Sequence, residues 1–188
     1  MNQQPVIEAT RQWIASVVIG LNLCPFAQRV FDAGLIRYVV SDARDELTLL
    51  DDLARELKAL NDSSDVETTL LIHPYVLASF LDYNDFLANA EQMVADLDLD
   101  GVIQIASFHP DYQFADTAAD AVENYTNRSP YPMLHLLREA SIDAVADDEE
   151  KLLEIPRRNI ETLRALGKEK VLAMLAAIRK AASLQAPP

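Results

Sequence analysis

The chain has 188 residues, half of them apolar, with 16 basic and 30 acidic side chains. This composition is too apolar for a disordered chain, and a net charge of −14 disfavours nucleic acid and anionic membranes as partners. No apolar run approaches the ~20 residues of a membrane span, no export signal is recognisable, and one cysteine excludes an internal disulfide. The sequence therefore predicts a single globular domain, residues 1–188, in the cytoplasm.

Helix and strand signals alternate along the first part of the chain. Apolar spacing predicts a helix from Ile7 to Ile19, and Pro25 suits the first position of a second helix that runs to Ala33. The next elements are strand Leu35–Val40, helix Ala43–Leu60, strand Thr68–Ile72, helix Asn84–Leu97 and strand Val102–Phe108. This order predicts an α/β fold, in which βαβ units form a small parallel or mixed sheet of three to four strands flanked by helices.

The last third of the chain is less regular. Residues 111–132 lack periodicity, and a loop of that length within a compact domain is usually functional or disordered. Met133–Val145 fits a helix better than a short fourth strand at Leu134–Leu137. Two C-terminal helices, Pro156–Leu166 and Lys168–Ala182, are expected to cover one face of the sheet rather than form a dimer surface, and the oligomeric state stays open.

Two of the three histidines end predicted strands. His73 and His109 each follow a strand and precede a proline, which turns the chain out of the sheet. Because ligands of parallel sheets bind at the carboxyl ends of the strands, we expect both imidazoles to face one site at that edge. The alternative is that both rings only hydrogen-bond loop backbone.

Arg128 ends a stretch, residues 59–127, that contains no Lys or Arg. Its guanidinium suits a carboxylate or phosphate, and Asn127 and Ser129 add hydrogen-bonding groups. Ser129 precedes Pro130 as a helix N-cap would, and a helix N-terminus favours anions. These residues are therefore predicted to bind the anionic group of a small substrate.

Asp111 and Tyr112 begin the long loop. Asp111 either orients a histidine, acts as a general base, or pairs with Arg128, a structural role that Asp116 could also fill. Tyr112 either lines a substrate pocket or only fixes the loop.

Cys24, the cap residue before Pro25 in the predicted second helix, would lie at the positive end of a helix dipole, which favours the thiolate. It is then either a nucleophile with a histidine as its base, or a ligand, with His73, His109 and His135, of a transition metal such as zinc. The third alternative is a small buried hydrophobe. The wide separations of these residues form no metal motif by themselves.

Three longer strings carry a family resemblance: GLNLCPFA at residues 20–27, IASFHPDYQF at 105–114 and TNRSPYPMLHLLRE at 126–139. They resemble the bacterial DUF1415 family, a domain of unknown function, over nearly the whole chain. This resemblance implies a family and no reaction.

Two functional hypotheses follow from these residues. The first is a small-molecule enzyme, a hydrolase or transferase, whose pocket at the carboxyl ends of the strands holds an anionic substrate with or without a metal. It predicts that Cys24, His73, His109 and Arg128 lie in one pocket. The second is a non-enzymatic protein that binds a metabolite or a partner.

Overall fold

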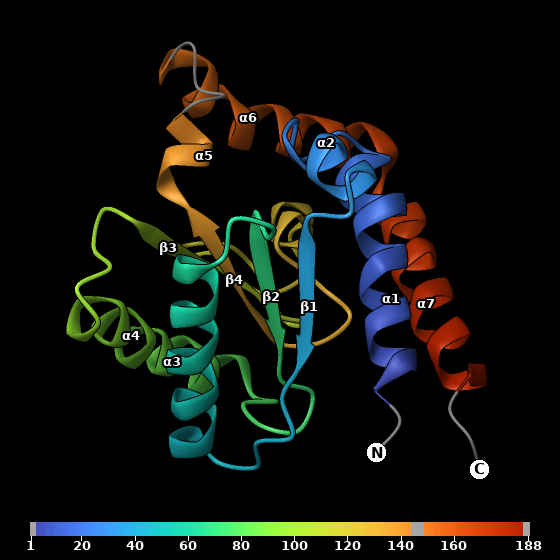
Figure 1. The fold of residues 1–188 in the computed structure, drawn as a ribbon. Coiled ribbons are helices and arrows are strands. Elements are labelled where there is room, and N and C mark those ends of the chain that lie inside the picture. The colour runs from blue at the N-terminus through green and yellow to red at the C-terminus, as the bar shows by residue number, and fades with distance from the viewer. Residues whose placement is uncertain (1–2, 144–148, 186–188) are drawn as a thin grey trace.

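The computed structural model describes residues 3–143 and 149–185 and contains a four-stranded mixed sheet in the order β1–β2–β4–β3 (Figure 1). The strands are β1 (Ile36–Val40), β2 (Thr68–Ile72), β3 (Ile103–Phe108) and β4 (Met133–Arg138). β1 and β2 are parallel, whereas β4 is antiparallel to both of its neighbours. β1, β2 and β3 therefore run in one direction, and the predicted α/β class is confirmed.

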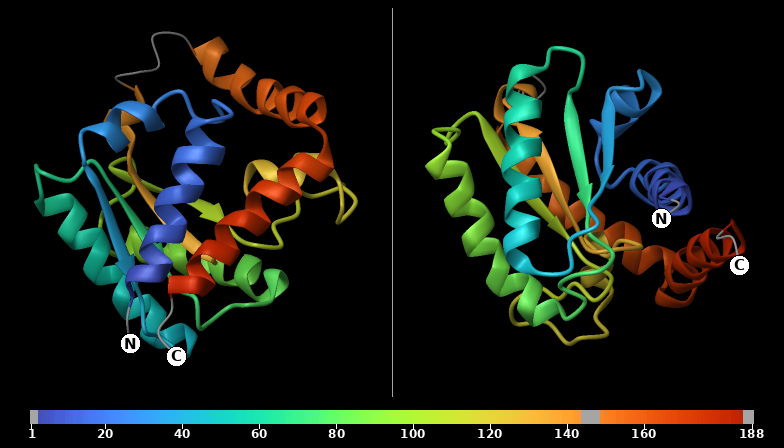
Figure 2. Two further views of the ribbon diagram at one scale, coloured as in Figure 1. Left: turned by 90° about the vertical axis from the view of Figure 1, so that its right-hand side faces the viewer. Right: turned by 60° about the horizontal axis from the view of Figure 1, so that its bottom comes forward.

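Helices form a layer on each side of the sheet. In chain order they are α1 (Gln4–Trp13), the π-helix η1 (Ile14–Ile19), α2 (Ala27–Asp32), α3 (Glu46–Asp62), α4 (Phe80–Asp96), the 3-10 helix η2 (Val122–Thr126), α5 (Glu139–Asp143), α6 (Glu149–Leu166) and α7 (Lys168–Gln185). α3 and α4 cover one face, and α1 and α7 lie side by side on the other (Figure 2). In the described part of the chain, no helix has the length and apolarity that a membrane crossing requires.

Each face of the sheet has its own hydrophobic core, because successive side chains of a strand point to opposite faces. In β2, Leu71 joins the core under α3 and α4, whereas Leu70 and Ile72 join the core under α1 and α7. All five residues of β2 are buried. The cytoplasmic location, the single domain and the exclusion of nucleic acid and membranes stay predictions.

The helix predicted at Met133–Val145 is wrong. The segment forms β4 and the short α5, and Val145 lies outside the described residues. β4 is an inner strand with Leu134 and Leu136 in one core and Met133 in the other. A strand that is covered on both faces lacks the polar alternation of a half-exposed strand, so its apolar run resembled a helix.

The C-terminal helices cover the second face, as favoured from the sequence. Leu163 of α6 and three residues of α7, namely Val171, Leu175 and Ile178, are buried in the core that also holds Trp13 of α1. The N- and C-terminal helices thus form one layer over this face.

Candidate functional site

The two strand-end histidines lie together, as predicted. β2 and β3 run in the same direction, so His73 and His109 leave the sheet at the same edge although β4 lies between their strands. Both side chains are fully buried, and both pack against Tyr83 of α4, with ring centroids 5.8 and 5.1 Å from the tyrosine ring. Tyr83 donates a hydrogen bond to the Met133 carbonyl and accepts one from the Phe108 N–H, which ties the ends of β3 and β4 together.

Both imidazoles hold the loop that follows β2. His109 Nε2 donates to the Leu77 carbonyl at 3.1 Å, and Nδ1 accepts from the Asp111 backbone N–H at 3.0 Å. His73 Nδ1 donates to the Val76 carbonyl at 3.2 Å, and its buried Nε2 has no partner among the described residues. Burial lowers the pKa of both groups, that of His73 to about 4, so both rings are neutral at pH 7. This geometry is the loop-anchoring alternative that the sequence left open.

The guanidinium of Arg128 is also committed to backbone. Nε donates to the Tyr112 carbonyl at 3.1 Å and Nη2 to the Ala119 carbonyl at 2.7 Å, while the group lies 4.3 Å from the centroid of the Tyr125 ring. These carbonyls take the place of the Asp111 or Asp116 carboxylate expected from the sequence. Arg128 therefore closes the long loop instead of facing an open site.

The neighbours of Arg128 are structural as well. No helix begins at Ser129, because the following segment is β4; the predicted N-cap is wrong, and its hydroxyl donates to the Tyr131 carbonyl at 2.7 Å. Asn127 donates to the Ser107 carbonyl at 3.2 Å. The ring of Tyr112 packs between those of Phe80 and Phe114.

Cys24 lies away from the histidine pair. α2 begins at Ala27, so Cys24 is not its cap and Pro25 is not its first residue. The Cys24 carbonyl accepts from the Ala27 N–H at 3.3 Å in the turn before that short helix. Its half-buried side chain lines a cavity on the other face of the sheet.

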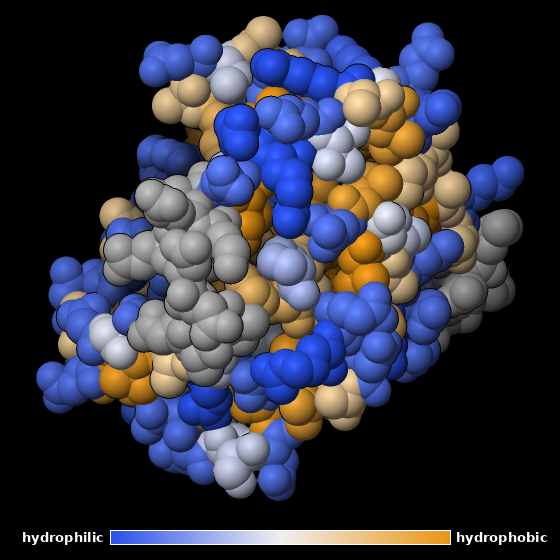
Figure 3. Space-filling view, turned by 90° about the horizontal axis from the view of Figure 1, so that it is seen from above, coloured by the Kyte–Doolittle hydropathy of each residue, from blue (hydrophilic) through white to orange (hydrophobic). Residues whose placement is uncertain are grey.

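This cavity, of about 330 Å³, lies between the N-terminal helices and the sheet. Its wall is largely apolar and includes Trp13, Ile14, Phe26, Val30, Leu70 and Phe108. Seen from above, over the end of the sheet where β1 and β2 begin, the molecule shows hydrophobic side chains among strongly hydrophilic ones (Figure 3). The cavity includes the first residues of β1 and β2, Ile36 and Thr68, and thus extends to the edge opposite the histidine pair.

The π-helix η1 shapes one wall of this cavity. Its wide turns are closed by hydrogen bonds from the Gly20 N–H to the Ala15 carbonyl at 3.0 Å and from the Leu23 N–H to the Val18 carbonyl at 2.8 Å. A Cβ at Gly20 would lie 2.9 Å from the Ser16 carbonyl carbon and closer still to its oxygen, so this turn requires glycine. π-helical turns occur frequently at functional sites, and this one follows Trp13.

The polar groups of the cavity floor come from β2 and β4. His135 of β4 contacts Thr68 of β2, with 2.7 Å between Nε2 and Oγ1, and the Thr68 hydroxyl donates to the Leu136 carbonyl at 2.6 Å. Burial among apolar side chains lowers the pKa of His135 to about 4, so this imidazole is also neutral at pH 7. Cys24 lies on the wall of the same cavity.

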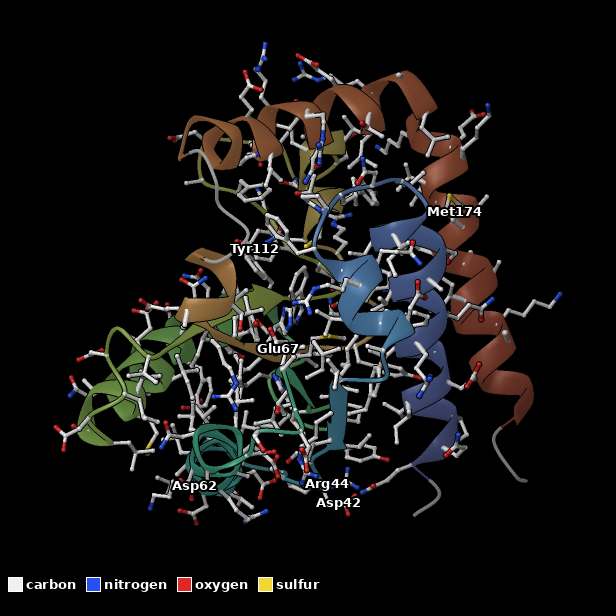
Figure 4. All side chains as sticks on the ribbon, turned by 45° about the horizontal axis from the view of Figure 1, so that its top comes forward. Asp42, Arg44, Asp62, Glu67, Tyr112 and Met174 are labelled. Carbon is white, nitrogen blue, oxygen red and sulfur yellow. The ribbon has the colours of Figure 1, made fainter. Side chains whose placement is uncertain are left out.

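Charged side chains stand at the rim. Arg29 of α2 pairs with Glu67 at 3.4 Å, and Glu67 lies in the space between α2 and α5 (Figure 4). Arg138 donates to the carbonyls of Leu60, Ser63 and Val66 at the end of α3. Both cations that line the cavity are thus engaged by groups of the protein.

The structure divides the residues that were expected to share one pocket. His73, His109 and Arg128 lie around the loops at the carboxyl ends of β2 and β3, whereas Cys24 and His135 line the cavity. Within residues 3–143 and 149–185, no three or more His, Cys, Asp or Glu side chains form a group that could hold a metal ion. Sequence reasoning missed Thr68 and Trp13, because each reads as an ordinary strand or helix residue.

One family model matches the chain, over residues 5–173, and its description is "Protein of unknown function (DUF1415)". Because the match covers most of the chain, the protein belongs to this family. No curated protein and no solved structure matches it.

Proposed function

We propose that this member of the DUF1415 family binds a small, largely apolar molecule in the cavity between the N-terminal helices and the sheet. The observation that carries this proposal is a volume of about 330 Å³ walled by apolar side chains, with the His135–Thr68 pair as a polar group on its floor. Ligand sites of proteins are typically cavities of this size, lined by apolar residues with a few placed polar groups.

The nature of the wall favours an organic occupant over water. A water molecule needs two to four hydrogen-bond partners, and apolar cavities in proteins take up apolar molecules instead. The rim cations Arg29 and Arg138 are engaged by Glu67 and by backbone carbonyls, so they do not favour the anionic substrate that the sequence suggested. We therefore expect the ligand to be uncharged where it meets the wall.

Trp13 offers a direct test, because it is the chain's one tryptophan and lines the cavity. Small aliphatic ligands such as 1-octanol do not absorb at the wavelengths that excite tryptophan. We expect them to change the fluorescence of Trp13 saturably and to raise the melting temperature of the protein. Ala106→Leu extends a side chain into the cavity and should abolish both effects while the protein stays folded. Ala88→Leu, at an exposed position of α4, is the matched control and should leave both effects intact.

A linear, unsaturable response, or binding that Ala106→Leu leaves unchanged, would contradict the proposal.

A second candidate function is nucleophilic catalysis by Cys24. It is favoured by one observation: the chain's single cysteine and the neutral imidazole of His135 line the same cavity. In such a reaction the thiol sulfur adds to a carbonyl carbon of the ligand, the π electron pair of that carbonyl moves to its oxygen, and the imidazole transfers the thiol proton to that oxygen.

Alkylation of Cys24 by iodoacetamide tests this second function. We expect alkylation at pH 7 to slow at least about tenfold in His135→Gln if the imidazole activates the thiol. A rate that depends on pH as it does for an ordinary cysteine, and that the variant does not alter, would make Cys24 a wall residue only.

A further inference from the structure

We infer that the ligand presents an uncharged hydroxyl or N–H group to Nδ1 of His135, so that the cavity selects alcohols or neutral N–H compounds over ethers and carboxylates. This inference rests on the proposed binding function and names the chemical class of the ligand.

The hydrogen bonds on the cavity floor fix the tautomer of His135. The Leu136 carbonyl can only accept, and the Thr68 hydroxyl has one hydrogen, which it donates to that carbonyl at 2.6 Å. In the contact of 2.7 Å between Thr68 Oγ1 and His135 Nε2, the imidazole must therefore be the donor. A separation of 2.7 Å is too short for a ring carbon, since C–H···O contacts span about 3.3–3.6 Å, so the ring orientation is fixed as well.

With its hydrogen on Nε2, the neutral ring carries a lone pair on Nδ1. Among the described residues no side chain or backbone group donates to Nδ1. Among the described residues, completely buried side-chain atoms without a partner occur in Trp13, Thr69, His73 and Asn159. Nδ1 of His135 is not among them. Nδ1 therefore keeps some accessible surface on a half-buried side chain, and because His135 lines the cavity we infer that its lone pair faces the cavity space. A ligand that forms a hydrogen bond with Nδ1 must therefore be the donor, because Nδ1 can only accept.

Charged groups fit this position poorly. A carboxylate has only acceptor oxygens and would place its lone pairs against that of Nδ1. The imidazole does not adapt by taking up a proton at neutral pH, because its apolar surroundings hold its pKa at about 4. An ammonium group can donate a hydrogen bond. Its burial against an apolar wall is nevertheless unfavourable, because the charged group loses its hydration shell.

The test compares three probes with the same chain: 1-octanol, 1-methoxyoctane and octanoate. Affinities are measured at pH 7.5 by Trp13 fluorescence and calorimetry. We expect octanol to bind at least about tenfold more tightly than the ether, because only octanol can donate to Nδ1, and octanoate to bind more weakly than octanol.

The variant Thr68→Val removes the hydroxyl that accepts from Nε2–H. The neutral imidazole then has no bond that keeps its hydrogen on Nε2 rather than on Nδ1. The ratio of octanol to ether affinity should then fall toward one, while the ether still binds. Thr69→Val is the matched control: the same substitution on the adjacent residue, whose side chain points to the opposite face of β2. It should leave the ratio unchanged.

The tautomer is also measured without any ligand, by ¹⁵N NMR of the histidine rings, with the His135 signals assigned through His135→Gln. An Nε2–H tautomer that Thr68→Val disturbs is expected; an Nδ1–H tautomer would overturn the inference whatever binds. Equal binding of octanol and ether, or tighter binding of octanoate, would overturn it and leave the binding function standing. If none of the three probes binds, the proposed function fails and the inference fails with it.

Discussion

Two adjacent threonines of β2 have opposite hydrogen-bonding situations. Thr68 Oγ1 bonds both His135 and the Leu136 carbonyl, whereas the completely buried Thr69 Oγ1 has no partner in the described part of the chain. A buried hydroxyl without a partner loses its hydration and gains nothing in return. We expect Thr69→Val to raise the free energy of unfolding by about 1 kcal/mol, measured by urea denaturation.

The same substitution at Thr68 should have the opposite sign. Thr68→Val leaves the Nε2–H of His135 without an acceptor, so the free energy of unfolding should fall by about 1–2 kcal/mol. If Thr68→Val and Thr69→Val both lowered the free energy of unfolding, the valine methyl would fit neither site. The effects on stability would then not be due to hydrogen bonding.

His109 uses both ring nitrogens to anchor backbone at the edge of the sheet. His109→Ala leaves the Leu77 carbonyl and the Asp111 N–H without that partner and opens a void beside Tyr83. We expect a loss of about 3 kcal/mol in the free energy of unfolding.

His109→Gln, whose amide can still donate to Leu77, is the control and should recover part of that loss. Near-normal stability of the alanine variant would contradict the anchoring role, and His109 would again be a candidate catalytic residue.

At the scale of elements, the π-helical turn of η1 depends on Gly20. A methyl group there meets the backbone of Ser16, which cannot move without changing the turn. We expect Gly20→Ala to cost about 2 kcal/mol of stability and to alter the fluorescence of Trp13, because the turn positions the cavity wall.

The control is Gly34→Ala, where a Cβ meets nothing but φ is +69°. The left-handed backbone should cost about 1 kcal/mol and leave Trp13 emission unchanged. Unchanged emission and stability in Gly20→Ala would show that the segment converts to an ordinary α-helix at no cost.

Flanking turn residues and residue type, rather than the exposure of one face, determined which elements could be predicted. α3 and β2 lie close to their predicted ranges because local apolar spacing and turn residues mark them. β4 is covered on both faces, as β2 is, but it could not be recognised as a strand because its leucine-rich run continues into α5 without a turn residue. α4 begins earlier than predicted, at a Ser79 cap whose hydroxyl accepts from the Asp82 N–H.

At the scale of the molecule, the sequence located one edge of the sheet correctly and missed the cavity. His73 and His109 could be placed together because strand direction alone determines which edge they reach. Cys24 and His135 meet in the cavity only because the N-terminal helices fold over the far face, beside α7. That packing joins residues more than a hundred positions apart, and no local pattern encodes it.

The same topology makes the stability of the whole molecule depend on pH through its buried histidines. His73 has a pKa of about 4 in the folded state, because burial disfavours its charged form, against about 6.5 in an unfolded chain. Between these values the unfolded state binds more protons, so stability is fully present above pH 6.5 and is lost as the pH falls toward 4. From pH 7.5 to 5 this histidine alone should cost about 2 kcal/mol.

Protonation of the 30 acidic side chains acts over part of the same range and relieves the repulsion of a net charge of −14. The histidine effect is therefore isolated as the difference between the wild type and His73→Asn, whose amide can still donate to the Val76 carbonyl. Urea denaturation of both proteins at several pH values should show the wild type losing about 2 kcal/mol relative to the variant by pH 5. A difference that stays constant with pH would mean that the imidazole of His73 is hydrated in the folded protein, and that the edge of the sheet around Tyr83 opens to solvent.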